Sequence, residues 1–326
     1  MTERTPGGSA GLLGAGLIVI AAVCFGTLGP ITRFADDAGV GSLAIVAWRA
    51  GIGATAMVVL LLTLRGATGR RPLALRDLPA GDRWFIGAAS MANLVLNLAM
   101  FIAFVRIEIG LSLLVFYSYP AFVAIASVLW FGERLDLVRW SALGVSMLGL
   151  VLTLTGTGGL GDLDALGIGL SFLAALTQAF YVLAARHGFA RIPPVEAAAM
   201  TMGGAALGYV VIALVTAQLV DLGAPLASVA ALVPVLLAGL IGAAIPTLCF
   251  ITGIRLLGAP RGAILATLEP VVGVALAAWL LNEQPELLQI AGGTLILVAA
   301  VLLQLGGRST VADHEAVPLT QGRAGR

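Results

Sequence analysis

Stretches of about 20 mostly apolar residues recur along nearly the whole chain and are separated by short polar breaks. As a helix, one such stretch crosses the roughly 30 Å hydrocarbon core of a bilayer. Of the 326 residues, 60% are hydrophobic and 11% are charged, whereas soluble proteins carry about 25% charged residues. The pattern predicts an all-α polytopic membrane protein with no room for a soluble domain.

Ten transmembrane helices account for these stretches. We place them at 12–34, 42–64, 84–105, 109–131, 138–156, 164–186, 196–219, 231–254, 261–281 and 287–306. The flanking residues 1–10 are expected to form a cytoplasmic N-terminal segment, and residues 308–326 a disordered cytoplasmic tail.

The arginines predict the orientation, because cytoplasmic loops retain Lys and Arg. All 18 basic residues are arginine. With the N-terminus inside, cytoplasmic segments hold 15 of them and external segments hold 2, while Arg49 lies within a span. The chain is therefore expected to cross the cytoplasmic membrane of a prokaryote with both termini inside. The net charge of +1 gives no indication of a nucleic-acid partner.

A weak internal repeat relates the two halves of the chain. Tyr119-Pro120 and Glu269-Pro270 occupy matching places, and Glu133 follows Pro120 at the distance at which Glu283 follows Pro270. We divide the chain into repeats at 11–158 and 159–307, each with five helices. Because five is odd, the second repeat must be inverted relative to the first. Inverted repeats with a site near the bilayer midplane are typical of secondary transporters.

Several of these motifs resemble the EamA domain of the drug/metabolite transporter superfamily. Leu268–Leu303 resembles the last two spans of that domain, and Tyr117–Leu152 resembles the same signature, with Gly132-Glu133-Arg134 matching its GER element. Cys24–Ala35 is similar to the opening span, and Arg49 in AWRAG matches an arginine that is usual there. The resemblance covers Gly11–Gly306. It implies ten helices around a central cavity and export of small metabolites or drugs.

Two departures from the family pattern weaken any transfer of a substrate from particular relatives. Phe25 stands where the family often has tryptophan, and Asn282-Glu283-Gln284 replaces the second GER element. Neither departure affects the expected fold.

Two charged residues lie deep within predicted spans, Arg49 and Glu269. An ionisable group at that depth is costly and therefore marks a candidate functional site. One interpretation is structural: the two form an ion pair, or Arg49 binds backbone carbonyls. The other is functional: Glu269 binds a cationic substrate or a proton, and Arg49 tunes it or binds a carboxylate.

Other polar residues within the spans form a second tier of candidates. Their amides and hydroxyls either bond neighbouring helices or line a substrate cavity. They are Asn93, Asn97, Tyr117, Tyr119, Gln178 and Tyr181. Pro120, Pro246 and Pro270 are candidate hinges, because proline removes a helical hydrogen bond. Glu133 and Glu283, near the ends of spans, are interpreted as caps or loop ties.

No cofactor, metal site or enzymatic activity is expected. His187 and His314 are the only histidines, and the sequence has no phosphate-binding loop and no GxSxG nucleophile motif. We predict a secondary transporter that exports a small organic metabolite or drug by alternating access, coupled to protons through Glu269. Membrane lipid is an expected partner, and the protein is expected to be a monomer or homodimer. The alternatives are a membrane protein that binds a lipid or protein partner without transport, and a passive channel.

Overall fold

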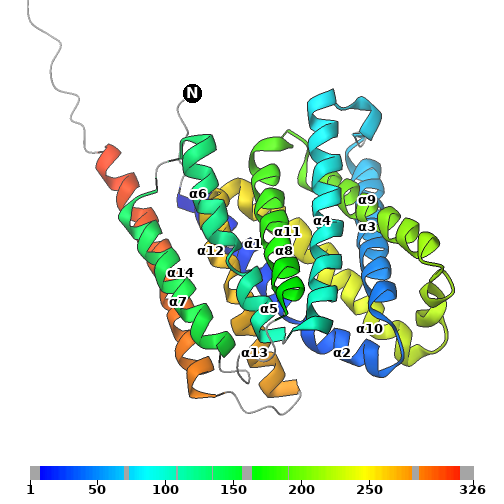
Figure 1. Ribbon diagram of the computed structural model, residues 1–326. Coiled ribbons are helices and arrows are strands. Elements are labelled where there is room, and N and C mark those ends of the chain that lie inside the picture. Colours follow the sequence, from blue (N-terminus) through cyan, green and yellow to red (C-terminus); the bar gives the residue numbers. More distant parts are fainter. Residues whose placement is uncertain are drawn as a thin grey trace, which may run out of the picture.

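The computed structural model describes residues 8–69, 73–107, 109–133, 135–155, 164–189, 191–280 and 286–315, and every regular element within these ranges is a helix. Figure 1 shows them as one bundle of mostly steeply inclined helices. The α-helices are α1 Gly8–Gly26, α2 Leu28–Asp37, α3 Ser42–Thr68, α4 Ala80–Arg106, α5 Ile109–Phe116, α6 Tyr119–Phe131, α7 Leu137–Thr155, α8 Ala165–Leu183, α9 Pro194–Val215, α10 Val229–Gly239, α11 Ile245–Leu257, α12 Ala259–Ala266, α13 Leu268–Leu280 and α14 Leu287–Glu315. Two 3-10 helices, η1 Leu75–Asp77 and η3 Asp221–Leu226, and two π-helices, η2 Ala184–Gly188 and η4 Leu240–Ala244, complete the set.

The helices have the length and composition of membrane spans. Five helical segments in the described ranges are long and apolar enough to cross a bilayer: Ser42–Ala67, Ser112–Phe131, Ala165–Gly188, Pro194–Val215 and Val229–Leu257. Ala10–Gly26, Leu137–Thr153 and Leu287–Leu302 are shorter apolar helices. Large apolar side chains such as Leu129, Trp130 and Trp279 are more than two-thirds exposed, as expected where lipid replaces water. The chain is therefore an integral membrane protein.

Three predicted spans are broken near their middle, each just before a proline. The breaks fall at Thr27, at Tyr117–Ser118 and at Thr267, and the prolines that follow are Pro30, Pro120 and Pro270. At each break a hydroxyl donates 2.6 Å to the carbonyl three residues earlier: Thr27 to Cys24, Ser118 to Val115 and Thr267 to Ile264. Each of these carbonyls also accepts the backbone N–H of the same residue, so the hydroxyl adds a second bond to the tight turn that ends the helical segment before the proline.

The helix around Pro246 changes in a different way. The π-helix η4 ends two residues before Pro246 and joins α10 to α11 without an open break. A π-turn shifts the hydrogen-bond register and leaves backbone carbonyls available to other donors. The second π-helix, η2, ends α8.

The two halves of the chain are interleaved. Each of four helices from the first half packs most extensively on a helix of the second: α1 on α11, α3 on α9, α4 on α8 and α7 on α14. The α7–α14 pair lies at one edge of the bundle in Figure 1. The two helices cross at Gly149 and Gly292, where a Cβ on Gly292 would collide with the Gly149 carbonyl. Only glycine permits so close an approach.

The described end of the chain differs from our expectation. Helix α14 continues to Glu315, so the first part of the expected disordered tail is helical. Residues 316–326 and the second break at 281–285, including Glu283, lie outside the described residues.

Candidate substrate site

Arg49, in the second turn of α3, binds a backbone carbonyl of the π-helix η4. Its Nε and Nη2 both donate to the Gly242 oxygen, at 3.1 and 3.0 Å. Its Nη1 donates to Asn97 Oδ1 at 3.0 Å. These bonds connect α3 to η4 and to α4, and they use three of the five guanidinium N–H groups. Arg49 therefore makes the carbonyl contact that was one of the two structural interpretations.

The Asn97 amide is held in one orientation by its neighbours on α4. Its Nδ2 donates to the Asn93 backbone oxygen at 2.8 Å and to Asn93 Oδ1 at 2.9 Å. Tyr209 of α9 is buried, lies near the Asn97 side chain, and donates to the Leu94 oxygen at 3.4 Å. Arg49, Asn93, Asn97 and Tyr209 form one polar group across α3, α4 and α9.

Glu269 begins α13, directly after the break at Thr267. Its half-buried carboxyl lies near the Tyr117 hydroxyl and within electrostatic range of Arg49. It forms no ion pair within 4.0 Å with any residue in the described ranges. Glu269 and Arg49 thus lie within electrostatic range of one another without forming an ion pair.

Tyr117 and Tyr119 flank the break between α5 and α6. Both are 2% exposed, and their rings form a cluster with Phe116, with centroid separations of 5.1 to 6.3 Å. The Tyr119 hydroxyl lies near the Gln178 amide of α8. Glu269, Tyr117, Tyr119 and Gln178 therefore form a second polar group, built on two of the broken spans and on α8.

The two polar groups together define the candidate site. One presents a carboxylate, which can accept a proton or a cationic group, and the other presents two guanidinium N–H groups without a bond to the described residues. The breaks before Pro120 and Pro270 place Tyr119 and Glu269 here. Pro246 lies in the first turn of α11, two residues after the end of η4, which supplies the carbonyl that Arg49 binds.

One predicted site residue lies apart from these groups, and two participants were missed. The Tyr181 hydroxyl is 3.4 Å from Thr201 Oγ1, and Tyr181 lies near Arg255 instead of Glu269. Tyr209 was overlooked, although a tyrosine within a span was a usable signal. The Gly242 carbonyl was missed because a backbone acceptor has no signature in the sequence.

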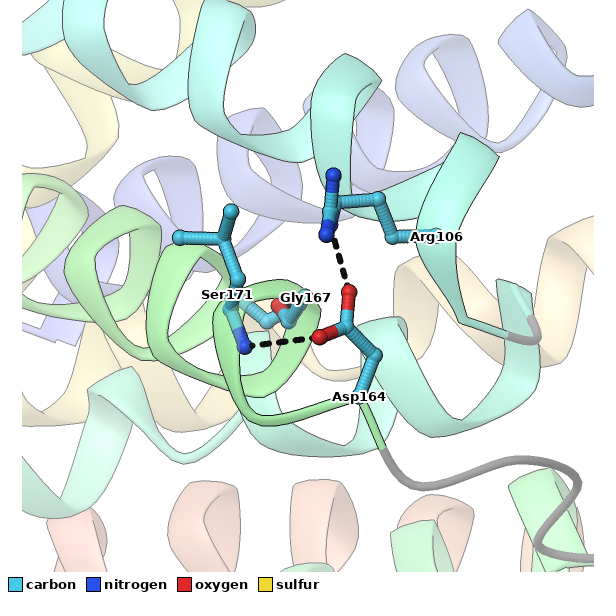
Figure 2. Close-up of polar contacts among 5 residues, drawn as sticks. Arg106, Asp164, Gly167 and Ser171 are labelled. Atoms are coloured by element: carbon cyan, nitrogen blue, oxygen red, sulfur yellow. Dashed lines mark hydrogen bonds and ion pairs between the residues drawn. The ribbon is translucent and has the colours of Figure 1, made fainter.

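A charged pair lies at one end of the bundle. Figure 2 shows Arg106, the last residue of α4, with its Nε 2.5 Å from Asp164 Oδ2, beside the N-terminus of α8. Asp164 also caps α8 by accepting from the Leu166 N–H at 3.1 Å. The hydrogen bond from Arg106, followed by the bond from Leu166, lowers the pKa of Asp164 below its usual value.

Helices broken at prolines around a polar centre that holds a half-buried carboxyl and a guanidinium are found in integral membrane proteins that transport solutes. The chain belongs to the EamA-like transporter family, which matches residues 12–155 and 165–305. It is therefore a member of a membrane transporter family.

The curated relatives are also transporters by name. An uncharacterized transporter of Synechocystis is 27% identical over 212 residues, which are 63% of this chain and 61% of that protein. An uncharacterized transporter of Archaeoglobus fulgidus is 25% identical over 290 residues, which are 89% of this chain and 95% of that protein. A solved structure described only as "Crystal structure of protein" has a TM-score of 0.75 and 20% identity, and the match covers 93% of this chain and 98% of that one. The last match shows the fold alone.

Proposed function

We propose that the protein is a ten-span secondary transporter of the cytoplasmic membrane that exports a small organic solute by alternating access, in exchange for protons bound at Glu269. The observation that carries this proposal is the position of Glu269. A half-buried carboxyl at a helix break, within electrostatic range of a guanidinium but not in an ion pair with it, is available to bind a proton or a cationic group.

The helix pairing supports two inverted repeats. Helices α4 and α8 belong to the third and sixth spans, whose counterparts in the other repeat are the eighth and first spans, α11 and α1. The α4–α8 and α1–α11 pairs are both among the most extensive in the bundle. The α3–α9 and α7–α14 pairs are each converted into themselves. This pattern is expected of a pseudo-two-fold axis between five-helix repeats. Because the repeats are interleaved, alternating access would require helices of one half to slide on those of the other.

Contacts between the ends of helices support the proposed sidedness. Arg106 and Asp164, both assigned to the external face, form an ion pair. Residues assigned to the cytoplasmic face also meet, since Arg255 binds the Phe189 carbonyl at 3.0 Å and Glu133 approaches His187. The excess of arginines at the second end supports its assignment to the cytoplasmic side.

Transport in proteoliposomes tests the proposal. Metabolite profiles of media from cells with and without the protein would first identify an exported solute. Its flux would then be measured in proteoliposomes with and without a pH gradient. We expect wild-type flux to follow the gradient, and Glu269→Gln to lose that dependence, because the amide cannot release a proton.

The matched control is Glu286→Gln, which changes an exposed glutamate before α14 and should leave the flux unchanged. If Glu269→Gln follows the gradient as the wild type does, proton coupling through Glu269 is wrong. Flux that never saturates would favour a passive channel, and stoichiometric binding without flux would favour a non-transporting protein.

A further inference from the structure

The predicted first and eighth spans are both interrupted, and each part of one packs on a part of the other. The first span consists of α1 and α2, separated at Thr27, and the eighth consists of α10 and α11, joined by the π-helix η4. Helix α1 packs most extensively on α11, and α2 packs most extensively on α10. Figure 1 shows α2 and α10 at the same end of the bundle. The two spans therefore run along one another on both sides of their interruptions.

The two interruptions meet where Leu28, the first residue of α2, lies on η4. A Cβ built on Gly242 would collide with Leu28 Cδ2 and lie 3.0 Å from Leu28 Cγ. The leucine side chain thus occupies the place where any other residue of η4 would carry its Cβ. Only glycine permits this approach, because carbon atoms of neighbouring side chains ordinarily stay about 3.5–4.0 Å apart. We call this contact the Leu28 seat.

Both charged groups of the central site are attached to this region. Arg49 donates twice to the carbonyl of Gly242. Gly26, at the end of α1, lies against the first turn of α13, where a Cβ would be 3.1 Å from the Glu269 carbonyl oxygen. The break between α1 and α2 therefore contacts the turn that carries Glu269 through one residue and the residue that holds Arg49 through another, Leu28.

The related pair of spans in the other repeat is not interrupted in this way. In the proposed exchange of repeats, the first and eighth spans correspond to the sixth and third, which are α8 and α4. Helix α4 is continuous from Ala80 to Arg106, and α8 is continuous from Ala165 to Leu183, with a π-helix only at its end. Helices bend where their hydrogen-bond ladder is interrupted. The first and eighth spans can therefore bend near their middle, whereas α4 and α8 form a stiffer pair.

We propose that the first and eighth spans bend together about one hinge, formed by residues 26–28 and η4, with the Leu28 seat as its pivot. Helices α2 and α10 would tilt as one body and open the half of the central site assigned to the external face. Gly26 and Leu28 are positioning residues of this hinge, since they act through the supports of Glu269 and Arg49. This inference rests on the proposed transport, because it describes how the central site opens.

The Leu28 seat is tested by thermal unfolding of the purified full chain in detergent. Gly242→Ala and Leu28→Ala should each lower the melting temperature by about 1–4 °C, the first through a collision and the second through lost contacts. The double variant should melt no lower than the lower single variant, because the new methyl group enters the space that the leucine left. If the two losses add, the seat is absent and the proposal is overturned. Should Gly242→Ala give no folded protein, recovery of folding by Leu28→Ala provides the same comparison.

Bending about the hinge is tested by thiol labelling in sealed membranes. The reporter is Gly273→Cys in a background where Cys24 and Cys249 are changed to alanine, labelled by a charged, impermeant maleimide from one face at a time. We expect Gly242→Ala to raise the ratio of external to cytoplasmic labelling rates about three- to tenfold, because lifting α2 off η4 favours external opening. Adding Leu28→Ala should return the ratio to within about twofold of the reporter protein.

Gly204→Ala is the matched control. A Cβ on Gly204 would lie 2.7 Å from Ser90 Cβ, but the contact joins α9 to α4, which are continuous helices. This change should lower the melting temperature and leave the labelling ratio within about twofold of the reporter protein. If Gly242→Ala leaves the ratio unchanged, or Gly204→Ala shifts it as far, the hinge is wrong while the proposed transport stands. If Gly273→Cys is labelled from neither face, the proposed transport fails, and the hinge fails with it.

Discussion

Replacing Arg49 by lysine tests whether this arginine holds the polar centre together. The guanidinium reaches two acceptors on different helices, the Gly242 carbonyl and Asn97 Oδ1. A lysine ammonium is a single point on a flexible stem and cannot reproduce this fork, so at least one acceptor would lose its partner. A hydrogen bond to a charged group contributes about 1.5–3 kcal/mol, and the orphaned acceptor is half-buried or deeper. We therefore expect Arg49→Lys to lower the free energy of unfolding by about 1.5–3 kcal/mol.

The assay is thermal unfolding in detergent, where for a chain of 326 residues that loss corresponds to a fall in melting temperature of about 2–4 °C. Arg65→Lys is the control, because Arg65 lies on the same helix with an exposed side chain. It should change the stability by less than about 0.5 kcal/mol. If Arg49→Lys melts within about 1 °C of the wild type, the contacts to Gly242 and Asn97 do not stabilise the fold, and the reasoning about the polar centre is refuted.

Three further predictions concern packing, backbone conformation and charge. Gly292→Ala should destabilise the protein by about 1–3 kcal/mol, because its Cβ meets backbone atoms of α7 that cannot move aside, whereas Gly144→Ala, which meets open space, should not. Gly258→Ala should destabilise the protein by about 1–3 kcal/mol, since Gly258 joins α11 to α12 with φ of 93° and ψ of 153°. Chemical or thermal unfolding measures the stability of both glycine variants. The pKa of Asp164 is lower in the folded protein than the usual aspartate pKa. The ion pair of Asp164 therefore stabilises the fold at pH values above the usual aspartate pKa, and this stabilisation is lost as the pH falls through the lower pKa of the folded state. The melting-temperature gap between wild type and Asp164→Asn should therefore stay constant from pH 8 to 5 and shrink below about pH 4.

Much of the helical framework was predictable because apolar length and proline position are local properties. The apolar stretches predicted an all-helical membrane protein, and its membership of the EamA-like family is confirmed. Glu269-Pro270 and Tyr119-Pro120 marked two of the three breaks, since proline acts on its own helix. Each break carries a hydroxyl side chain, at Thr27, Ser118 or Thr267. The sequence shows these residues, but their position at a break could be inferred only together with the proline that follows.

Contacts between helices were less predictable. Nothing in the sequence indicates that α8 ends in a π-helix or that η4 offers the Gly242 carbonyl to Arg49, because such acceptors belong to the backbone. Glu133 was interpreted as a cap or loop tie, and its partner His187 is distant in the chain, so only the folded structure brings them together. The roles of Glu269, Arg49 and their neighbours in binding remain predictions.

Thiol labelling beside Glu269 tests most directly whether the polar centre is a wet site open in turn to both sides. Gly273 lies one turn beyond Glu269 on the same helix face, and its Cβ would meet only the Gly26 carbonyl at 3.9 Å, so a cysteine fits there. Gly273→Cys would be made in a background where Cys24 and Cys249, which are free thiols, are changed to alanine. We expect a charged, membrane-impermeant thiol reagent to label it when added from either face of the membrane. Labelling by a lipid-soluble reagent alone would contradict the account.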